Sequence, residues 1–436
     1  MILGLPAILG FLPLVIYLVF AFKGKNLLGT VIVCVIAGAV LTGQTPVSLS
    51  VAISKGVASF LGLIGFIIMM GAGLGEVLTE TKVARNLVAI LIKKIGIKNQ
   101  NQAILVTMFI STLLVALLGT LAGANAMIAP IIIPIVASFG LTPNALAVIL
   151  HGAGACGLFI GPFVPPVITL LGLTKLPYAT YLLQVGFPVA ALVFITTYFV
   201  GKSVQKKYAG KESYSEEEKS DGGIFTATPQ INRATCVFIV LMILLLGYGI
   251  FAKAGAAYAI FVMLAVAFIT GIAAGMPLEN IINCLTKGAT KLFFLFFMFV
   301  LYDPFLNFVT ETGAFDTLAN ILKPLIEVGG DIGFIVISTL VGIFGVSGAA
   351  VAQSVVLNDL FSAIVHDINL PMTIWATVLL IGSQITSFAY PTGDMIGQMG
   401  IARSKDVKSM IRNGVTVTVV IVLYVVVRAI IYSISK

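Results

Sequence analysis

The chain has 436 residues, of which 59% are hydrophobic and only 10% are charged. A soluble domain carries about 25% charged residues, so this composition excludes a soluble protein. The formal net charge of +8 does not indicate nucleic-acid binding, because the basic residues flank apolar segments, as they do at the cytoplasmic face of membrane proteins.

Apolar stretches of about 20 residues recur along the whole chain, and a helix of that length spans the hydrocarbon core of a bilayer. The alternating pattern of a membrane β-barrel is absent. The sequence therefore predicts an all-α transmembrane fold. The first 22 residues lack a basic start and a small-residue cleavage site, so we expect a first helix and not a signal peptide. The four cysteines have neither disulfide nor metal-ligand spacing.

The first repeat is predicted over residues 1–201. It has two spanning helices, a third long helix, a short amphipathic interfacial segment, a re-entrant hairpin, a broken helix and a closing helix. The ranges of these elements are about 2–22, 27–43, 57–78, 82–95, 102–140, 144–173 and 179–201. The hairpin is interrupted by small residues from Gly119 to Asn125, and its arms are too short for two full crossings.

A polar linker is predicted over residues 202–234, and its composition is typical of a flexible, solvated segment. The second repeat, 235–436, has the same order of elements, with a hairpin at about 332–366 and a broken helix at about 371–402. Collinear matches between the halves support the repeat. They pair Lys55-Gly56 with Lys287-Gly288, Thr79-Glu80-Thr81 with Thr310-Glu311-Thr312, Pro143 with Pro371, Gly154 with Gly382, Gly172 with Gly400, and Gly186 with Gly414.

Re-entrant hairpins leave five crossings in each repeat, so the second repeat has inverted topology. The chain then has about 10 crossings and two hairpins. Most Lys and Arg residues fall on one side, which the positive-inside rule assigns to the cytoplasm. We therefore expect an integral protein of a plasma (inner) membrane, with the linker in the cytoplasm and both termini outside.

Helices that stop inside a membrane leave unpaired N–H groups at one end and unpaired carbonyls at the other, so ion and substrate sites are expected near the bilayer midplane. Ionisable residues there indicate function, because burying them is costly. Asp394 is a candidate cation ligand, with helix capping as its structural alternative. Asp303, beside Pro304, is a candidate cation or proton site, or a structural hydrogen-bond partner of a freed backbone group. His151 is a candidate proton relay, or makes a helix–helix hydrogen bond.

Asn125 is the one strongly polar side chain at the first hairpin apex, and we expect it to contact both a cation and the substrate. Na+ is expected at Asn125 and Asp394. The residues expected to bind substrate are Gly123, Asn125, Ser347, Gly348, Ser387 and Thr392. No Lys or Arg lies in this predicted site, so an anionic substrate would depend on helix N-termini, amides and hydroxyls.

No Walker A motif, zinc-binding His-Glu-x-x-His motif or Gly-x-Ser-x-Gly nucleophile motif is present. We therefore expect neither an enzyme nor an ATP-driven pump, and no cofactor other than Na+ or H+ as the coupling ion.

The order of elements resembles the ion transporter superfamily, which includes the divalent-anion:sodium symporters, the gluconate permeases and the NhaC-type sodium/proton antiporters. In architecture the resemblance covers essentially the whole chain. The segment from Gly123 to Pro130 is similar to the Ser-Asn-Thr hairpin apex of the divalent-anion symporters. Asn125 matches, whereas Ala124 and Ala126 replace the hydroxyl residues. The resemblance implies an elevator mechanism and a homodimer.

Together these observations predict a secondary transporter that moves a small organic anion or amino-acid-like solute with Na+ or H+. The alternative is a Na+/H+ antiporter without an organic substrate, and a more remote one is a membrane subunit of a larger complex. The expected partners are the solute and the lipid bilayer, with no nucleic acid.

Overall fold

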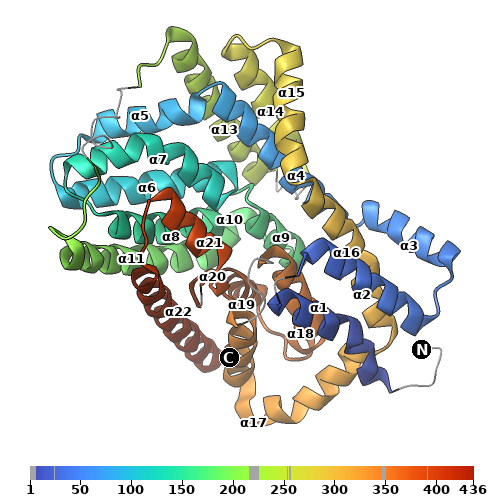
Figure 1. Cartoon of the computed structure of the whole chain (residues 1–436). Helices are drawn as coiled ribbons and strands as arrows, with labels where there is room; N and C mark the ends of the chain where they lie inside the picture. The colour runs from blue at the N-terminus through green and yellow to red at the C-terminus, as the bar shows by residue number, and fades with distance from the viewer. Residues whose placement is uncertain are drawn as a thin grey trace.

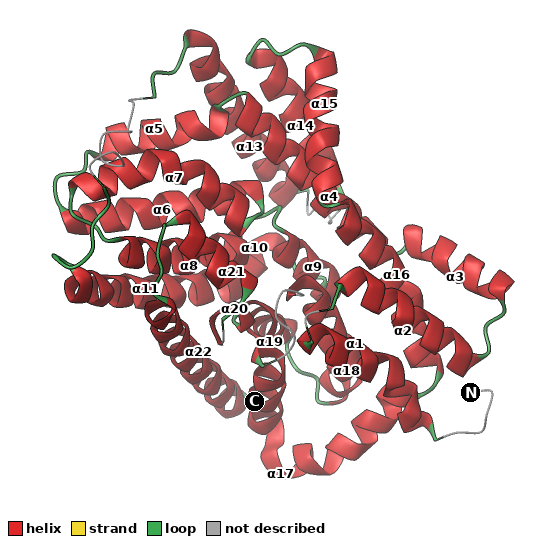
Figure 2. Cartoon of the chain, viewed as in Figure 1, coloured by secondary structure: helices red, strands yellow, loops and turns green. Residues whose placement is uncertain are grey.

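The computed structural model describes residues 6–23, 25–215, 225–252, 254, 257–344, 350–389 and 391–436. Within these ranges the chain is built from helices and contains no strand (Figure 1, Figure 2). Eight helical segments of this part of the chain are long and apolar enough to span a membrane, and shorter apolar helices accompany them. The all-α transmembrane fold predicted from the sequence is therefore confirmed.

The first repeat contains each predicted element and one additional helix, α3. Its elements are η1 (Ala7–Phe11), α1 (Leu12–Phe22), α2 (Leu27–Thr42), α3 (Pro46–Val57), α4 (Phe60–Glu80), α5 (Val83–Ile95), α6 (Gln100–Leu118), α7 (Leu121–Ser138), α8 (Pro143–Ile160), α9 (Pro165–Thr174), α10 (Tyr178–Tyr181), η2 (Leu182–Gly186) and α11 (Phe187–Tyr208). Sequence analysis did not identify α3 as a separate helix. Ser59 causes the separation, because its side chain accepts a hydrogen bond from the Gly62 amide and starts a new helix there.

The second repeat has the same order, including α15 as the counterpart of α3. Its elements are α13 (Pro229–Phe251), α14 (Tyr258–Ala273), α15 (Leu278–Lys291), α16 (Phe293–Glu311), α17 (Ala314–Ile343), α18 (Ala350–Asp367), α19 (Met372–Gln384), α20 (Thr386–Ala389), α21 (Gly393–Ile401) and α22 (Val407–Ser435). Gly330 has non-helical angles, φ 59° and ψ −168°, that kink α17. This kink separates the amphipathic segment from the first hairpin arm, near the boundary predicted at residue 332.

The first hairpin is formed by α6 and α7. Gly119 ends α6 with φ 69°, and the Thr120 hydroxyl accepts a hydrogen bond from the Gly123 amide at the start of α7. The second hairpin is formed by the end of α17 and by α18. Its predicted apex, including Ser347 and Gly348, lies outside the described residues.

The two repeats pack reciprocally, since α4 contacts α15, and α16 contacts α2 and α3. The matched glycines Gly56 and Gly288 lie at equivalent places in these contacts. A Cβ atom at Gly56 would lie 2.3 Å from the Val300 carbonyl oxygen, and one at Gly288 would lie 2.3 Å from the Ala72 carbonyl oxygen. Such exchanged contacts are expected of repeats related by a pseudo-twofold axis.

A second matched pair, Gly186 and Gly414, lies where the closing helix of each repeat crosses its broken helix. A Cβ atom would lie 2.6 Å from the Phe159 carbonyl oxygen at Gly186, and 2.0 Å from the Phe388 carbonyl oxygen at Gly414. Two of the glycine matches found in the sequence therefore mark equivalent close backbone contacts.

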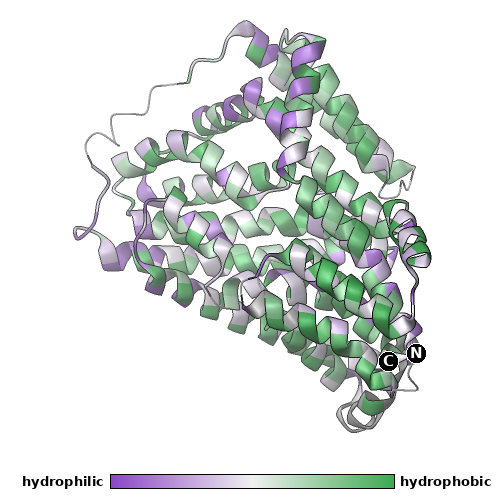
Figure 3. Ribbon diagram, turned by 45° about the vertical axis from the view of Figure 1, so that its right-hand side comes forward, coloured by the Kyte–Doolittle hydropathy of each residue, from purple (hydrophilic) through white to green (hydrophobic). Residues whose placement is uncertain are grey.

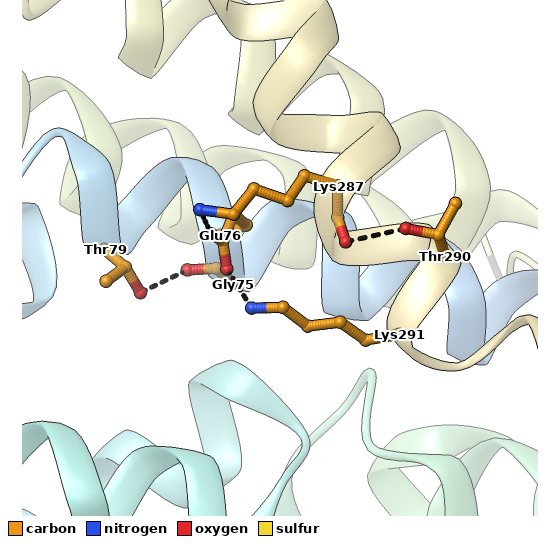
Figure 4. Close-up of polar contacts among 6 residues, drawn as sticks. All are labelled: Gly75, Glu76, Thr79, Lys287, Thr290 and Lys291. Atoms are coloured by element: carbon orange, nitrogen blue, oxygen red, sulfur yellow. Dashed lines mark hydrogen bonds and ion pairs between the residues drawn. The ribbon is translucent and has the colours of Figure 1, made fainter.

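Glu76 of α4 joins the repeats through ion pairs with α15 (Figure 4). Its carboxylate lies 2.7 Å from Lys287 Nζ and 2.5 Å from Lys291 Nζ. The Glu76 side chain is 12% exposed, whereas both lysines are more than half exposed. Since the lysines stay in contact with solvent, each pair contributes little to stability. Their role is to fix the end of an interface that glycine contacts hold together.

The residues after α11 fold back onto both repeats instead of extending into solvent as the composition indicated. The Tyr214 hydroxyl donates to the Ala402 carbonyl at 2.9 Å, and Asn144 donates to Glu212 at 2.5 Å. The Tyr208 hydroxyl also donates to Asp406. Tyr214 is buried, and an aromatic ring with a hydrogen-bonding hydroxyl stabilises such a contact. The start of the predicted linker is therefore part of the folded protein.

Apolar side chains cover much of the outer surface (Figure 3). Ile243, Leu244 and Phe251 of α13 are 65%, 64% and 88% exposed. Such exposure suits contact with lipid tails and would be unfavourable in water. Both termini lie away from the segment between α11 and α13 in the two views of Figure 1 and Figure 3. This placement agrees with the predicted topology, in which the linker and the termini lie on opposite faces.

The Gly288 contact predicts a specific packing defect. Gly288→Ala places a methyl group against the Ala72 carbonyl and should destabilise the protein by about 1–3 kcal/mol. Gly247→Ala is the matched control, because no atom lies within 4 Å of a Cβ at that helical position. Thermal unfolding of the purified variants should show a lower midpoint for Gly288→Ala alone. Equal midpoints for the two variants would contradict this account of the interface.

Asp406, which caps α22 outside the membrane-spanning segment, predicts a pH dependence. Burial acts to raise its pKa, but hydrogen bonds from Ser409, Tyr208 and the Lys408 amide, with the charge of Lys207, lower it overall. A lowered folded-state pKa stabilises the fold fully above the unfolded carboxyl pKa of about 3.9, and this contribution is lost as the pH falls towards the folded-state value. The unmodified protein should therefore unfold at a higher temperature than Asp406→Asn at pH 7, and the difference should shrink below about pH 4. A difference independent of pH would show that the Asp406 charge has no such role.

Candidate functional site

Asn125 is the centre of a buried polar junction between the two repeats. Its side-chain oxygen accepts a hydrogen bond from Ser111 of α6 at 2.7 Å. Its amide nitrogen donates to the Leu150 carbonyl of α8 at 2.9 Å and to Gln398 Oε1 of α21 at 2.7 Å. Asn125 and Gln398 are both fully buried. The first hairpin is thereby bonded to the broken helices of both repeats.

Asp394 lies one helical turn before Gln398 on α21. Residues four apart project from the same face of a helix, so the two side chains share a face. Asp394 is exposed, whereas Gln398 is buried. The carboxylate therefore lies on the accessible side of the amide junction. Thr392 is the residue that caps α21, through a 3.4 Å bond from the Met395 amide, and Asp394 occupies the first turn.

His151 follows Leu150 on α8 and is fully buried. Its ring lies 4.5 Å from the Phe388 ring of α20, between centroids. Within the described part of the chain neither ring nitrogen of His151 has a hydrogen-bond partner, and Gln398 Nε2 has none either. Buried polar atoms are normally paired, so these unpaired groups beside Asn125 mark a place that water or an ion can occupy.

The first helix break offers few groups to an ion. The Tyr181 hydroxyl donates to the Phe159 carbonyl at 3.0 Å, and the Tyr178 hydroxyl donates to the Ile160 carbonyl at 2.7 Å. At the other side of the break, Pro165 and Pro166 occupy the first positions of α9 and have no N–H group. The carbonyls and N–H groups expected to be free at this break are thus largely bonded or absent.

The second break keeps the other predicted residues. Ser387 donates to the Gln384 carbonyl at 3.0 Å, and Thr392 is buried. Gly123 lies at the exposed start of α7, on the hairpin that carries Asn125. Tyr390 lies outside the described residues.

Asp303 belongs to a different part of the protein. Its helix, α16, packs on α2, α3 and α4, whereas α21 packs on α7, α8, α20 and α22. Asp303 is half-buried and accepts a hydrogen bond from Asn307 at 3.1 Å. The structure therefore groups Asn125, His151 and Asp394 and places Asp303 among the helices that join the repeats.

Gln353 of α18 is the counterpart of Asn125 that sequence analysis missed. It lies 228 positions after Asn125, the same spacing that separates Pro143 from Pro371 and Gly154 from Gly382. Its amide nitrogen donates to the Gly342 carbonyl of α17 and, at 2.8 Å, to the Gly382 carbonyl of α19. Each hairpin thus has an amide that bonds it to the broken helix of its own repeat. The constant spacing was a signal that identifies Gln353, whereas no sequence signal identifies Gln398 as the partner of Asn125.

The electrostatic character of the interior limits the ligand. Among the described residues, the buried polar side chains are hydroxyls, amides and one imidazole, and none is Lys, Arg, Asp or Glu. No group of three His, Cys, Asp or Glu side chains in this part of the chain is placed to hold a metal ion. Neutral oxygen atoms with one accessible carboxylate suit a hard monovalent cation or a proton better than an anion.

Comparisons with known proteins agree with an ion transporter. The model of the Na+/H+ antiporter family matches residues 1–202, which is the part assigned to the first repeat. No curated protein sequence matches the chain. The crystal structure of the Alcanivorax borkumensis YdaH transporter, described as having an unusual topology, is similar at a TM-score of 0.65. The two chains are 14% identical over 88% of this chain and 89% of that one, a likeness that concerns the fold alone. Taken together, these findings support ion-coupled transport by this integral membrane protein.

Proposed function

We propose that this protein exchanges Na+ for H+ across the membrane. The observation that carries the proposal is the line of side chains from exposed Asp394 to buried Gln398 and on to Asn125. A carboxylate at the accessible end can bind either Na+ or H+, and competition for one group produces exchange. The amide and carbonyl oxygens behind it can replace part of the water shell of the ion. The family match over the first repeat supports the same reaction.

The proposed roles follow from position. Asp394 is the group for which the two cations compete, and Asn125 and Gln398 supply neutral oxygen ligands. His151, buried beside Leu150, is the candidate that passes a proton to or from this site. Gly123, Ser387 and Thr392 contribute hydroxyl or backbone groups at the ends of the helices around the site.

We also propose an elevator movement. Hairpin α6–α7, α8 and α21 contact one another and would move together, while α4, α15, α2 and α16 form a separate set of inter-repeat contacts. The proposal keeps the predicted homodimer, the cytoplasmic linker, the external termini and a plasma-membrane location. It requires no cofactor besides the exchanged ions.

Proteoliposomes that contain only this protein test the proposal. An inward Na+ gradient, with the membrane potential clamped and a pH dye inside, should drive protons outwards and raise the internal pH. Flux that begins only when an organic carboxylate or amino acid is added would replace exchange with symport of that solute. Absence of flux under both conditions would contradict both functions and indicate that further subunits are needed.

Asp394→Asn should reduce Na+-driven proton flux by at least about 100-fold, as expected when an essential proton-transfer group is removed. The variant keeps the size of the side chain and the Thr392 cap, so the protein should still fold. Asp367→Asn is the control, because Asp367 is exposed at the end of α18. If Asp394→Asn exchanges ions at the unmodified rate, the proposed ion site is wrong.

The amide junction predicts a coupling between Asn125 and Gln398. Each single change to Ala leaves a buried partner without its hydrogen bond and should cost about 1–3 kcal/mol. The double variant should lose less than the sum of the two, in stability and in Na+ affinity. Asn86→Ala, whose partners are Asn232 and Thr235, should be additive with Gln398→Ala and serves as the control. Additivity of Asn125→Ala and Gln398→Ala would mean that the junction does not act as a unit.

A further inference from the structure

A cavity of about 560 Å³ lies apart from the ion site, between α9, the start of α4 and the turn that joins α13 to α14. Its volume falls within the range of about 300–1,000 Å³ that is usual for small-molecule sites. α9 belongs to the broken helix of the first repeat, whereas α13 and α14 begin the second repeat. The cavity therefore lies where a moving broken helix would face the helices that stay in place.

The wall of this cavity is mostly apolar and rich in aromatic rings. Phe60, Phe163, Tyr178 and Tyr258 all line it. The two tyrosine hydroxyls are already committed as donors, Tyr178 to the Ile160 carbonyl and Tyr258 to the Leu245 carbonyl at 3.0 Å. The rings thus present apolar surface, which suits a planar or branched hydrocarbon body.

Lys175 supplies the one charged group of the lining. Its ammonium lies 5.1 Å from the centroid of the Phe60 ring, which holds the side chain at the cavity. No Asp or Glu lines the cavity, so a ligand with an ammonium group would meet no opposite charge there. The charge pattern therefore favours a monoanion over a zwitterion or a cation.

The backbone of Lys175 is also unusual, with φ 57° and ψ 19° in the left-handed region. Lysine rarely adopts this conformation, whereas glycine adopts it easily. A glycine would end α9 equally well, so the helix end alone does not require a lysine. The side chain at this position is consistent with a use for its charge.

We propose that this cavity binds a small carboxylate with an aromatic or branched apolar body, with the carboxylate at Lys175 and the body among the four rings. The site is separate from Asp394 and does not depend on the proposed ion exchange. An anionic lipid has the same chemistry, but the enclosed volume and the lone cation favour the small free carboxylate.

Equilibrium binding of radiolabelled phenylacetate to the purified protein tests this site. The protein is placed in phosphatidylcholine nanodiscs without an ion gradient. Binding should saturate, and Lys175→Gln should weaken it by about tenfold, as expected for the loss of a charge-assisted hydrogen bond. Lys55→Gln is the matched control, since Lys55 is exposed and remote from the cavity lining. Ala179→Phe, which fills the cavity while leaving Lys175 in place, should also weaken binding.

Three comparisons separate the alternatives. Neutral phenylacetamide should compete poorly, and equal competition would overturn the role of Lys175. Nanodiscs that contain phosphatidylglycerol should bind phenylacetate as before, whereas loss of binding in them that depends on Lys175 would identify a lipid as the occupant and overturn the proposal. Asp394→Asn should bind phenylacetate normally, so a failure of ion exchange and a failure of this site give different results. Absence of saturable binding by the unmodified protein would also overturn it.

Discussion

The structure depends on how backbone groups are satisfied where helices end inside the membrane. Lipid offers no hydrogen bonds, so each freed carbonyl or N–H group needs a partner from the protein or from an enclosed ligand. Tyr178 and Tyr181 supply partners at the first break. At the second break, Gln353 and Thr386 both bond to the Gly382 carbonyl. These bonds fix each hairpin and closing helix against its broken helix, and the remaining packing follows from that arrangement.

The same requirement creates the ion site. Asn125 satisfies the Leu150 carbonyl and at the same time reaches Gln398 of the other repeat. A side chain that bonds to the backbone of one repeat and to an amide of the other makes the two halves interdependent. Because amides provide oxygen atoms without charge, the junction stays buried at little electrostatic cost and still coordinates a cation once one arrives.

Local patterns were sufficient to predict most of the fold. Apolar lengths gave the helices, and small residues and prolines located the hairpins and breaks. The Lys-Gly matches at Gly56 and Gly288 located contacts that proved to be equivalent. The short helices α3 and α15 were missed because a cap such as Ser59 interrupts the apolar run only slightly. The fold of the early linker was missed because the partners of Tyr208 and Tyr214 are distant in sequence.

The site was only partly predictable for the same reason. Asn125, Asp394 and His151 were identified because polar residues are conspicuous in apolar segments. Gln398 was not, since the bond that gives it meaning joins residues far apart in the chain. Gln353 was recoverable from the repeat spacing, but a search for a second asparagine overlooked it. Which polar residues meet is decided by tertiary packing, and composition cannot supply that information.

The two repeats share a backbone plan but differ in the chemistry of their breaks, and this difference gives the transporter one ion site instead of two. The same spacing of 228 residues that pairs Asn125 with Gln353 pairs Pro166 with Asp394. The first break therefore has a second proline where the other break has a carboxylate. Tyrosines also close the first break, whereas α21 begins with an exposed acidic residue. A symmetric frame lets the mobile elements move between equivalent positions, while the asymmetric residues confine cation binding to the second break and its contact with Asn125.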